Sequence, residues 1–148
     1  MATTSTVPAA KTALVTLISA ALPGVQVTYG RPPDNELERE CVYVGNVSGV
    51  QRIPTMRAGR KPREETYSVE IVVAILLERG TTSDAEDRAF ELLAECEDVV
   101  ADDPTLAIAS AAGSFEAVAG SFESTADYTL EGPACVVQWN VDCKARLS

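Results

Sequence analysis

The chain of 148 residues contains no histidine, and this absence removes several kinds of catalytic chemistry. A Ser-His or Cys-His nucleophilic pair, a HExxH zinc site and histidine-based proton transfer all need an imidazole group. Cysteine is scarce as well, because the four cysteines at positions 41, 96, 135 and 143 include no CxxC pair. This spacing excludes a zinc finger, and we expect buried free thiols.

Glycine-rich motifs that bind phosphate groups are also missing. The segment AGRKPREE, residues 58–65, contains Gly-Arg-Lys but lacks the GxxxxGK[ST] spacing of a P-loop, and no GxGxxG motif follows a strand pattern. The carboxylate pairs Glu64-Glu65 and Asp102-Asp103 are neighbours in sequence, so they do not converge on one point and we expect both to be solvated. We therefore expect a protein that is not an enzyme and that has no catalytic, cofactor-binding or metal-binding residues.

Positive charge is in the minority, with 12 basic against 22 acidic residues and a formal net charge of -10. Long-range attraction to nucleic acid or to anionic lipid is therefore unfavourable over most of the surface. No apolar run approaches the roughly 18 residues of a membrane span. The run at residues 12–22 also fits the apolar part of a secretory signal, but we expect a soluble, intracellular protein without membrane contact.

Two segments have the apolar periodicity of helices. The first covers about residues 7–22, where Ser5 or Thr6 can cap the helix and Pro23-Gly24 ends it. The second is expected to begin at Ser83, whose capping-box partner would be Glu86, and to stop at residues 102–104. Its apolar stripe consists of Ala85, Ala89, Leu92, Leu93, Cys96, Val99 and Val100.

Five segments have strand patterns, at residues 25–29, 41–50, 66–77, 114–130 and 134–146. Gly45 and Gly49 predict a bulge or bend in the second. The third becomes apolar on both faces, which predicts a central strand covered on both sides. The last alternates strictly, which predicts one polar face and one buried face that carries Trp139.

The expected order of elements is therefore α-β-β-β-α-β-β. Polar loops between consecutive strands favour hairpins, and two one-sided helices need a sheet to cover their apolar stripes. We expect one α+β domain over residues 1–148, with two helices packed on a mainly antiparallel sheet of about five strands.

Four basic residues, Arg57, Arg60, Lys61 and Arg63, gather in a flexible loop that we expect at about residues 54–65. They could form a solvated hairpin loop whose charges discourage edge pairing. They could also form an arm that orders on an acidic surface of a neighbouring subunit or protein. Nucleic acid is a third partner, although four charges without interleaved aromatic residues predict weak, salt-sensitive binding.

Two blocks of the sequence carry a resemblance to a known family. VYVGNVSGVQRIPTMRAGRKPREETYSVEIVV (residues 42–73) and AEDRAFELLAECEDVVADDPTL (residues 85–106) resemble the tail terminator proteins of long-tailed phages of actinobacteria. The similarity in element order extends over about residues 8–147, whereas the first helix and the last strands match in pattern alone. No catalytic motif defines this family.

The resemblance implies a virion subunit that is assembled in the host cytoplasm and forms a ring. In the family that it resembles, the ring has six subunits. The ring would cap the head-proximal end of the tail tube, stop polymerisation of the major tail tube protein and offer a joining surface to the head-completion or connector protein. The loop with Arg57, Arg60, Lys61 and Arg63 would contact a neighbouring subunit or the tube. DNA would pass through the lumen without specific binding, since carboxylates repel phosphate groups.

Carboxylates on the polar face of the second helix, Glu91, Glu95 and Asp98, are candidates for the lumen or for a partner-facing surface, and ordinary solvation is the alternative. Two other functions stay open. The chain could be another neck component, such as a head-tail connector or tail-completion protein, or a small non-enzymatic binding module with a basic arm.

Overall fold

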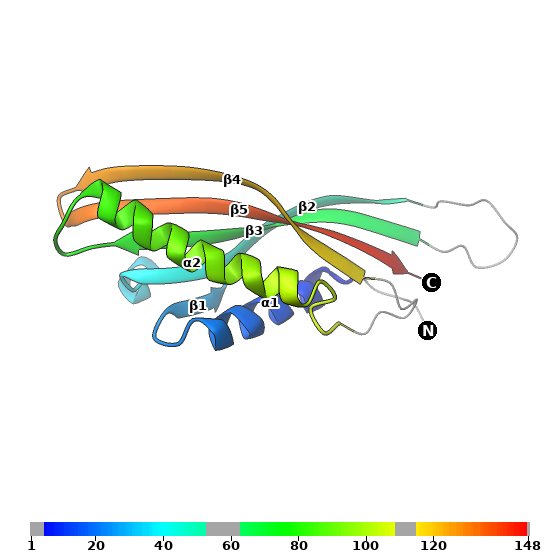
Figure 1. Ribbon diagram of the computed structural model, residues 1–148. Coiled ribbons are helices and arrows are strands. Elements are labelled where there is room, and N and C mark those ends of the chain that lie inside the picture. The colour runs from blue at the N-terminus through cyan, green and yellow to red at the C-terminus, as the bar shows by residue number, and fades with distance from the viewer. Residues whose placement is uncertain (1–4, 53–62, 109–114, 148) are drawn as a thin grey trace, which may run out of the picture.

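The computed structural model describes residues 5–52, 63–108 and 115–147 and confirms an α+β fold. Two helices and five strands follow one another in the expected order (Figure 1). A single turn of 3-10 helix, η1, lies between the first two strands. The elements are α1 (Val7–Ala21), β1 (Gln26–Tyr29), η1 (Asp34–Glu36), β2 (Glu40–Arg52), β3 (Arg63–Leu76), α2 (Thr82–Asp102), β4 (Phe115–Thr129) and β5 (Gly132–Leu147).

The five strands form one sheet with the order β1-β2-β3-β5-β4. All neighbouring pairs are antiparallel except β1 and β2, which run parallel. The hairpin expected for β1 and β2 is therefore wrong. The connection from Gly30 to Arg39 includes η1 and returns the chain to the end of the sheet from which β1 started, so β2 runs in the same direction.

Both helices lie on the same face of the sheet (Figure 1). Among the described residues, no layer covers the opposite face, so the expectation that β3 is covered on both sides is wrong. Val72 points to this open face and is nevertheless 2% exposed, because its neighbours in register are Tyr43 on β2 and Gln138 on β5. Side-chain packing within the sheet thus buries an apolar residue that the sequence pattern assigns to a second layer.

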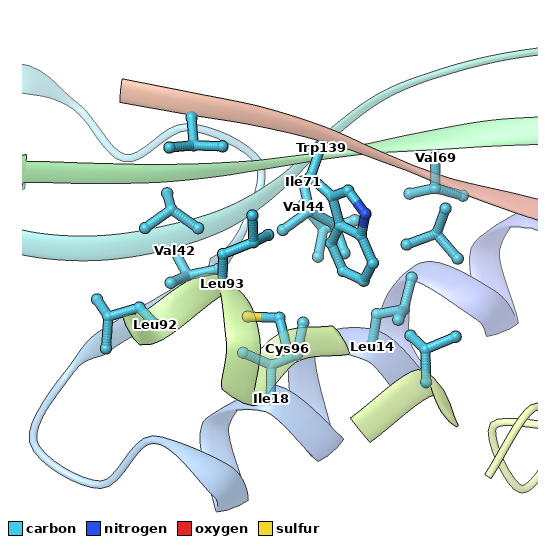
Figure 2. Packing of buried hydrophobic residues seen from close by; sticks show 14 of the residues in the cluster. Leu14, Ile18, Val42, Val44, Val69, Ile71, Leu92, Leu93, Cys96 and Trp139 are labelled. Atoms are coloured by element: carbon cyan, nitrogen blue, oxygen red, sulfur yellow. The ribbon is translucent and has the colours of Figure 1, made fainter. Parts of the chain in front are cut away.

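The core lies between the two helices and the sheet. Trp139 on β5 is the largest fully buried side chain, and Figure 2 shows it among Ile71, Val44 and Leu14. The expected apolar stripe of α2 is confirmed, since six of its seven residues are buried and Val99 packs against the cluster. All four cysteines are buried and free, as expected.

Three local devices shape the elements. A register shift between Val44 and Val47 confirms the bulge expected near Gly45. Gly49 serves another purpose, because a Cβ atom there would lie 2.3 Å from the Cβ of Tyr67 on the paired strand. The cap of α2 differs from the expectation: Thr81 and Asp84 form the capping box, and the helix begins at Thr82.

Candidate interaction surfaces

The basic loop lies largely outside the described residues. This holds for Arg57, Arg60 and Lys61. Arg63 is the first residue of β3, so the expected loop boundary at about residue 65 is too late. Its Nη1 donates a hydrogen bond to Oε1 of Gln51, at 3.5 Å, and this contact spans the β2–β3 hairpin.

The sheet end that bears this hairpin combines cations with carboxylates. Arg52 is in register with Glu64, which is in turn in register with Arg146 on β5. Lys144 on β5 is in register with Glu116 on β4. The order of the strands therefore places opposite charges beside one another, and sequence reasoning missed this pattern because the paired residues are up to about 80 positions apart.

Glu65 corrects a second expectation. It was expected to be solvated, yet it is 2% exposed and lies beneath the first turn of α1. Its carboxylate accepts hydrogen bonds from the backbone N–H of Thr6 at 2.6 Å, from the hydroxyl groups of Ser5 and Thr6, and from Nε2 of Gln51 at 3.0 Å. These donors satisfy a carboxylate that would otherwise be costly to bury.

The same network explains how the α1 N-terminus is held. Thr6 stands at the N-cap, as expected, but its hydroxyl group contacts Glu65 and Tyr67 in place of the helix backbone. Desolvation alone would raise the pKa of Glu65, but the hydrogen bonds from Thr6, Gln51 and Ser5 outweigh it and the pKa is lowered. Burial raises the pKa of Tyr67. The ionised Glu65 therefore attaches α1 to β3.

The three carboxylates of the acidic face, Glu91, Glu95 and Asp98, are all exposed on α2, as a solvent or partner face requires. Glu91 differs from the other two because Nη1 of Arg88 lies 3.0 Å from its Oε2. Arg88 also binds Glu40, at the start of β2, through Nε at 2.5 Å and Nη2 at 3.1 Å. Part of the negative charge on this face is therefore already compensated.

Arg88 joins α2 to the sheet through a bidentate contact with the Glu40 carboxylate, which fixes the relative orientation of the two side chains. Its hydrogen bonds lower the pKa of Glu40, and the partners Glu40 and Glu91 raise the pKa of Arg88. Beside it, a hollow of about 540 Å³ lies between α2 and the end of α1, with Glu91 and Glu95 on its lining. Sequence reasoning assigned no role to Arg88, because its main partner is 48 positions away.

A larger hollow, of about 610 Å³, opens near the turn between β4 and β5. Its lining is mainly apolar and includes Leu37, Leu76, Leu130 and Val136. Charged residues from the η1 segment and from the β4–β5 turn, including Asp34, stand on the lining as well. This surface was not anticipated from sequence, because it joins segments that are about 90 residues apart.

Among the described residues, the large exposed apolar side chains lie along the two margins of the sheet, except for Val136 on β5. Tyr29 on β1 and Val50 on β2 mark one margin, with 53% and 57% exposure. The other margin carries Val118, Phe122 and Tyr128 of β4 and Leu130 of the turn that follows. Large exposed apolar groups that concentrate in this way are typical of surfaces that contact another macromolecule.

Within the described residues, no group of three or more acidic or cysteine side chains is placed to hold a metal ion. No helix in that part of the chain is long and apolar enough to cross a membrane. Comparison of the chain with protein-family models and with curated proteins finds no match in either set.

Proposed function

We propose that this chain is a non-enzymatic structural subunit of a long-tailed phage, which forms a ring that caps the tail tube. The ring is hexameric in the family that the sequence resembles. The ring would stop polymerisation of the major tail tube protein and join the tail to the head-completion or connector protein. In this role the shape of the ring determines its function, because one face of the ring must bind the tube and the other face must not bind further tube subunits.

The observation that carries the proposal is the resemblance of residues 42–73 and 85–106 to tail terminator proteins. In the fold, the first block supplies most of β2 and β3, and the second supplies most of α2. These elements meet in the core, where Val44, Ile71 and Leu93 pack with Trp139 (Figure 2). The resembling segments thus belong to one structural unit, which supports a shared fold and a shared role.

The surfaces supply further support. The exposed carboxylates of α2 and the exposed apolar residues at the sheet margins offer two different chemistries to partners. In the proposed ring, Glu91, Glu95 and Asp98 either line the lumen, where carboxylates repel DNA, or face a partner. The loop with Arg57, Arg60 and Lys61, together with Arg63 at the start of β3, serves as the arm that reaches a neighbouring subunit or the tube.

The test is electron microscopy of particles that assemble when this gene is switched off in its own phage. Headless tails of uncontrolled length are the expected result. Tails of normal length beside unjoined heads would instead assign the chain to the second candidate, a connector or tail-completion protein. Intact virions would refute both phage roles and leave a small binding module.

The arm is tested by replacing Arg57, Arg60 and Lys61 with serine. Polar loop residues contribute little to the free energy of unfolding, so the variant should fold normally. We expect it to lose the ability to limit the length of tubes that purified tail tube protein forms, as measured by negative-stain microscopy. Arg63→Ser is tested separately, because this residue belongs to β3 and contacts Gln51.

The matched control removes the same amount of charge at other sites. Arg31, Arg39 and Arg79 are exposed and lie outside both the loop and the β2–β3 hairpin. Their triple serine variant should still limit tube length. If the loop variant limits tube length as well as the control does, the arm interpretation is wrong.

A further inference from the structure

The sheet has two long margins whose backbone groups pair with no strand among the described residues. On one side, β4 is a 15-residue edge strand. Near its start, the backbone N–H of Ala117 donates to the carbonyl of Pro104 at 2.8 Å, so the segment after α2 occupies that point of the edge. From Val118 to Thr129 the edge has no such partner in the described chain.

The opposite margin is free over half of a strand. β1 pairs with residues 41–44 of β2 and then ends. Beyond that point, and after the bulge at residues 45–46, Val47–Arg52 of β2 pair with β3 on one side, and no described strand lies on the other side. Residues Ser48–Arg52 are all exposed. Figure 1 shows β4 and β1 at opposite margins of the sheet.

Charge distinguishes the two margins. β4 carries Glu116, Glu123 and Asp127 and no lysine or arginine. Residues 45–52 of β2 carry a single charged side chain, Arg52. Two β4 strands in contact would therefore bring carboxylates against carboxylates, which is unfavourable for directly opposed residues. A β4 edge beside the β2 edge places carboxylates beside a neutral and basic strand.

Strand direction favours the same pairing. Each of the steps from β2 to β3, from β3 to β5 and from β5 to β4 is antiparallel, so β4 runs opposite to β2. If a second copy continues the sheet in the same orientation, and is shifted along the strands so that its β1 does not overlap Val118–Thr129, its β2 meets β4 in the antiparallel sense, which is the more stable type of ladder. The exposed apolar residues on both margins, such as Val118 and Val50, then lose contact with water.

We propose that the β4 edge, residues Val118–Thr129, binds the free half of β2 in a second copy of this chain, head to tail, and extends the sheet from one subunit to the next. Such a contact uses two different surfaces of each subunit and so generates a ring or an open chain. The inference rests on the proposed function only for closure into a ring. The pairing itself follows from the edges, their exposed apolar groups and their charges.

The test uses two variants of the full chain and sedimentation velocity. Thr125→Lys places a cation on the exposed β4 edge, which meets the basic end of the incoming β2 strand, and Val50→Glu places a carboxylate on the β2 edge, which meets the acidic β4 strand. We expect wild-type protein to self-associate. Each variant alone should associate at least about tenfold more weakly than the wild type. An equimolar mixture of the two variants should associate again, because each variant retains the edge that the other lacks.

Matched controls lie one strand further in on the same open face. Gln138→Lys on β5 and Thr66→Glu on β3 introduce the same charged groups at exposed positions away from the edges, and both should associate like the wild type. Circular dichroism verifies that every variant is folded, and Glu123→Lys replaces Thr125→Lys if that variant does not fold.

Several outcomes would overturn the proposed pairing. They are a wild-type protein that stays monomeric up to its solubility limit, a mixture that fails to associate, controls that weaken as strongly as the edge variants, and one edge variant that associates normally. The gene-off experiment separates this inference from the proposed function. Intact virions with confirmed pairing would refute the phage role alone, whereas tails of uncontrolled length with a monomeric protein would refute the pairing alone.

Discussion

Trp139 represents the core at the scale of a single residue. It is 1% exposed and lies on the helix-covered face of β5, in register with Ile71 on β3 and with Phe122 on β4. Replacing it with alanine removes the largest buried side chain and leaves a cavity, so we expect a loss of about 3–5 kcal/mol in the free energy of unfolding. Urea denaturation followed by circular dichroism measures this loss.

The matched control for this substitution is Tyr128→Ala, because Tyr128 is another aromatic residue on a strand but is 65% exposed. We expect it to change the free energy of unfolding by less than about 0.5 kcal/mol. If Trp139→Ala cost less than about 1 kcal/mol, the assignment of Trp139 to the core would be wrong.

Glu65 makes stability depend on pH. Its pKa is lower in the folded chain than the value of about 4.3 in an unfolded chain, so its ionised form stabilises the fold above that value. This stabilisation is lost as the pH falls through the folded pKa. Glu65→Gln should therefore cost about 1–3 kcal/mol at pH 7, and its stability should decline less steeply than that of the wild type below about pH 4.5.

Urea denaturation of both proteins at pH 7 and at several acidic pH values measures this difference. The slope should not vanish in Glu65→Gln, because Glu40 also has a lowered pKa and contributes in the same direction. Parallel curves for the wild type and the variant would show that the hydrogen bonds from Ser5, Thr6 and Gln51 do not stabilise the ionised carboxylate.

At the scale of elements, α2 allows a direct comparison between Thr81, the observed N-cap, and Ser83, the N-cap that the sequence pattern favours. The hydroxyl group of Thr81 accepts the N–H of Asp84 at 3.2 Å, and the Asp84 carboxylate accepts the N–H of Thr81 at 2.9 Å. We expect Thr81→Ala to lower the free energy of unfolding by about 1 kcal/mol. Ser83→Ala, at the cap position that the sequence pattern favours, should change it by less than about 0.5 kcal/mol. Thermal and urea denaturation distinguish the two, and equal losses would contradict the observed cap.

The elements also show which features of the fold can be predicted from local sequence patterns. Strict alternation in β5 and the apolar stripe of α2 are local properties, and both elements were predicted with boundaries that differ by one or two residues. The parallel pairing of β1 was missed, because partner choice depends on the path of the connecting segment. The burial of Glu65 was missed for the same kind of reason, since its donors Ser5 and Thr6 are about 60 positions away.

The same distinction between local features and features that depend on distant residues applies to the surfaces. Exposure of Glu91, Glu95 and Asp98 could be predicted from helical periodicity. The ion pair of Arg88 with Glu40 and the register of Arg52 with Glu64 could not, because they depend on which strands become neighbours. The open edge of β4 is likewise a property of strand order, which no local pattern encodes.

For the whole molecule, the four cysteines report cooperative unfolding. They are no more than 1% exposed, and burial raises the pKa of Cys41 to about 11 and of Cys96 and Cys143 to about 12. A thiol reagent attacks the thiolate, so the native protein should react slowly at pH 8, whereas all four thiols should react quickly in denaturant. Absorbance of the released chromophore measures this, and rapid reaction of one thiol in native protein would contradict the packing around it.

The position of β5 has a consequence for synthesis of the chain. β5 lies between β3 and β4 and is the last of the five described strands to be translated. The two most extensive ladders of the sheet therefore form only after β5 has been synthesised. While the ribosome is still translating β5, β3 has one paired side, β4 has none, and the apolar face destined for Trp139 stays open. The nascent chain therefore passes through a stage in which it exposes unpaired strands, and this stage ends only when residues 132–147 have emerged and inserted.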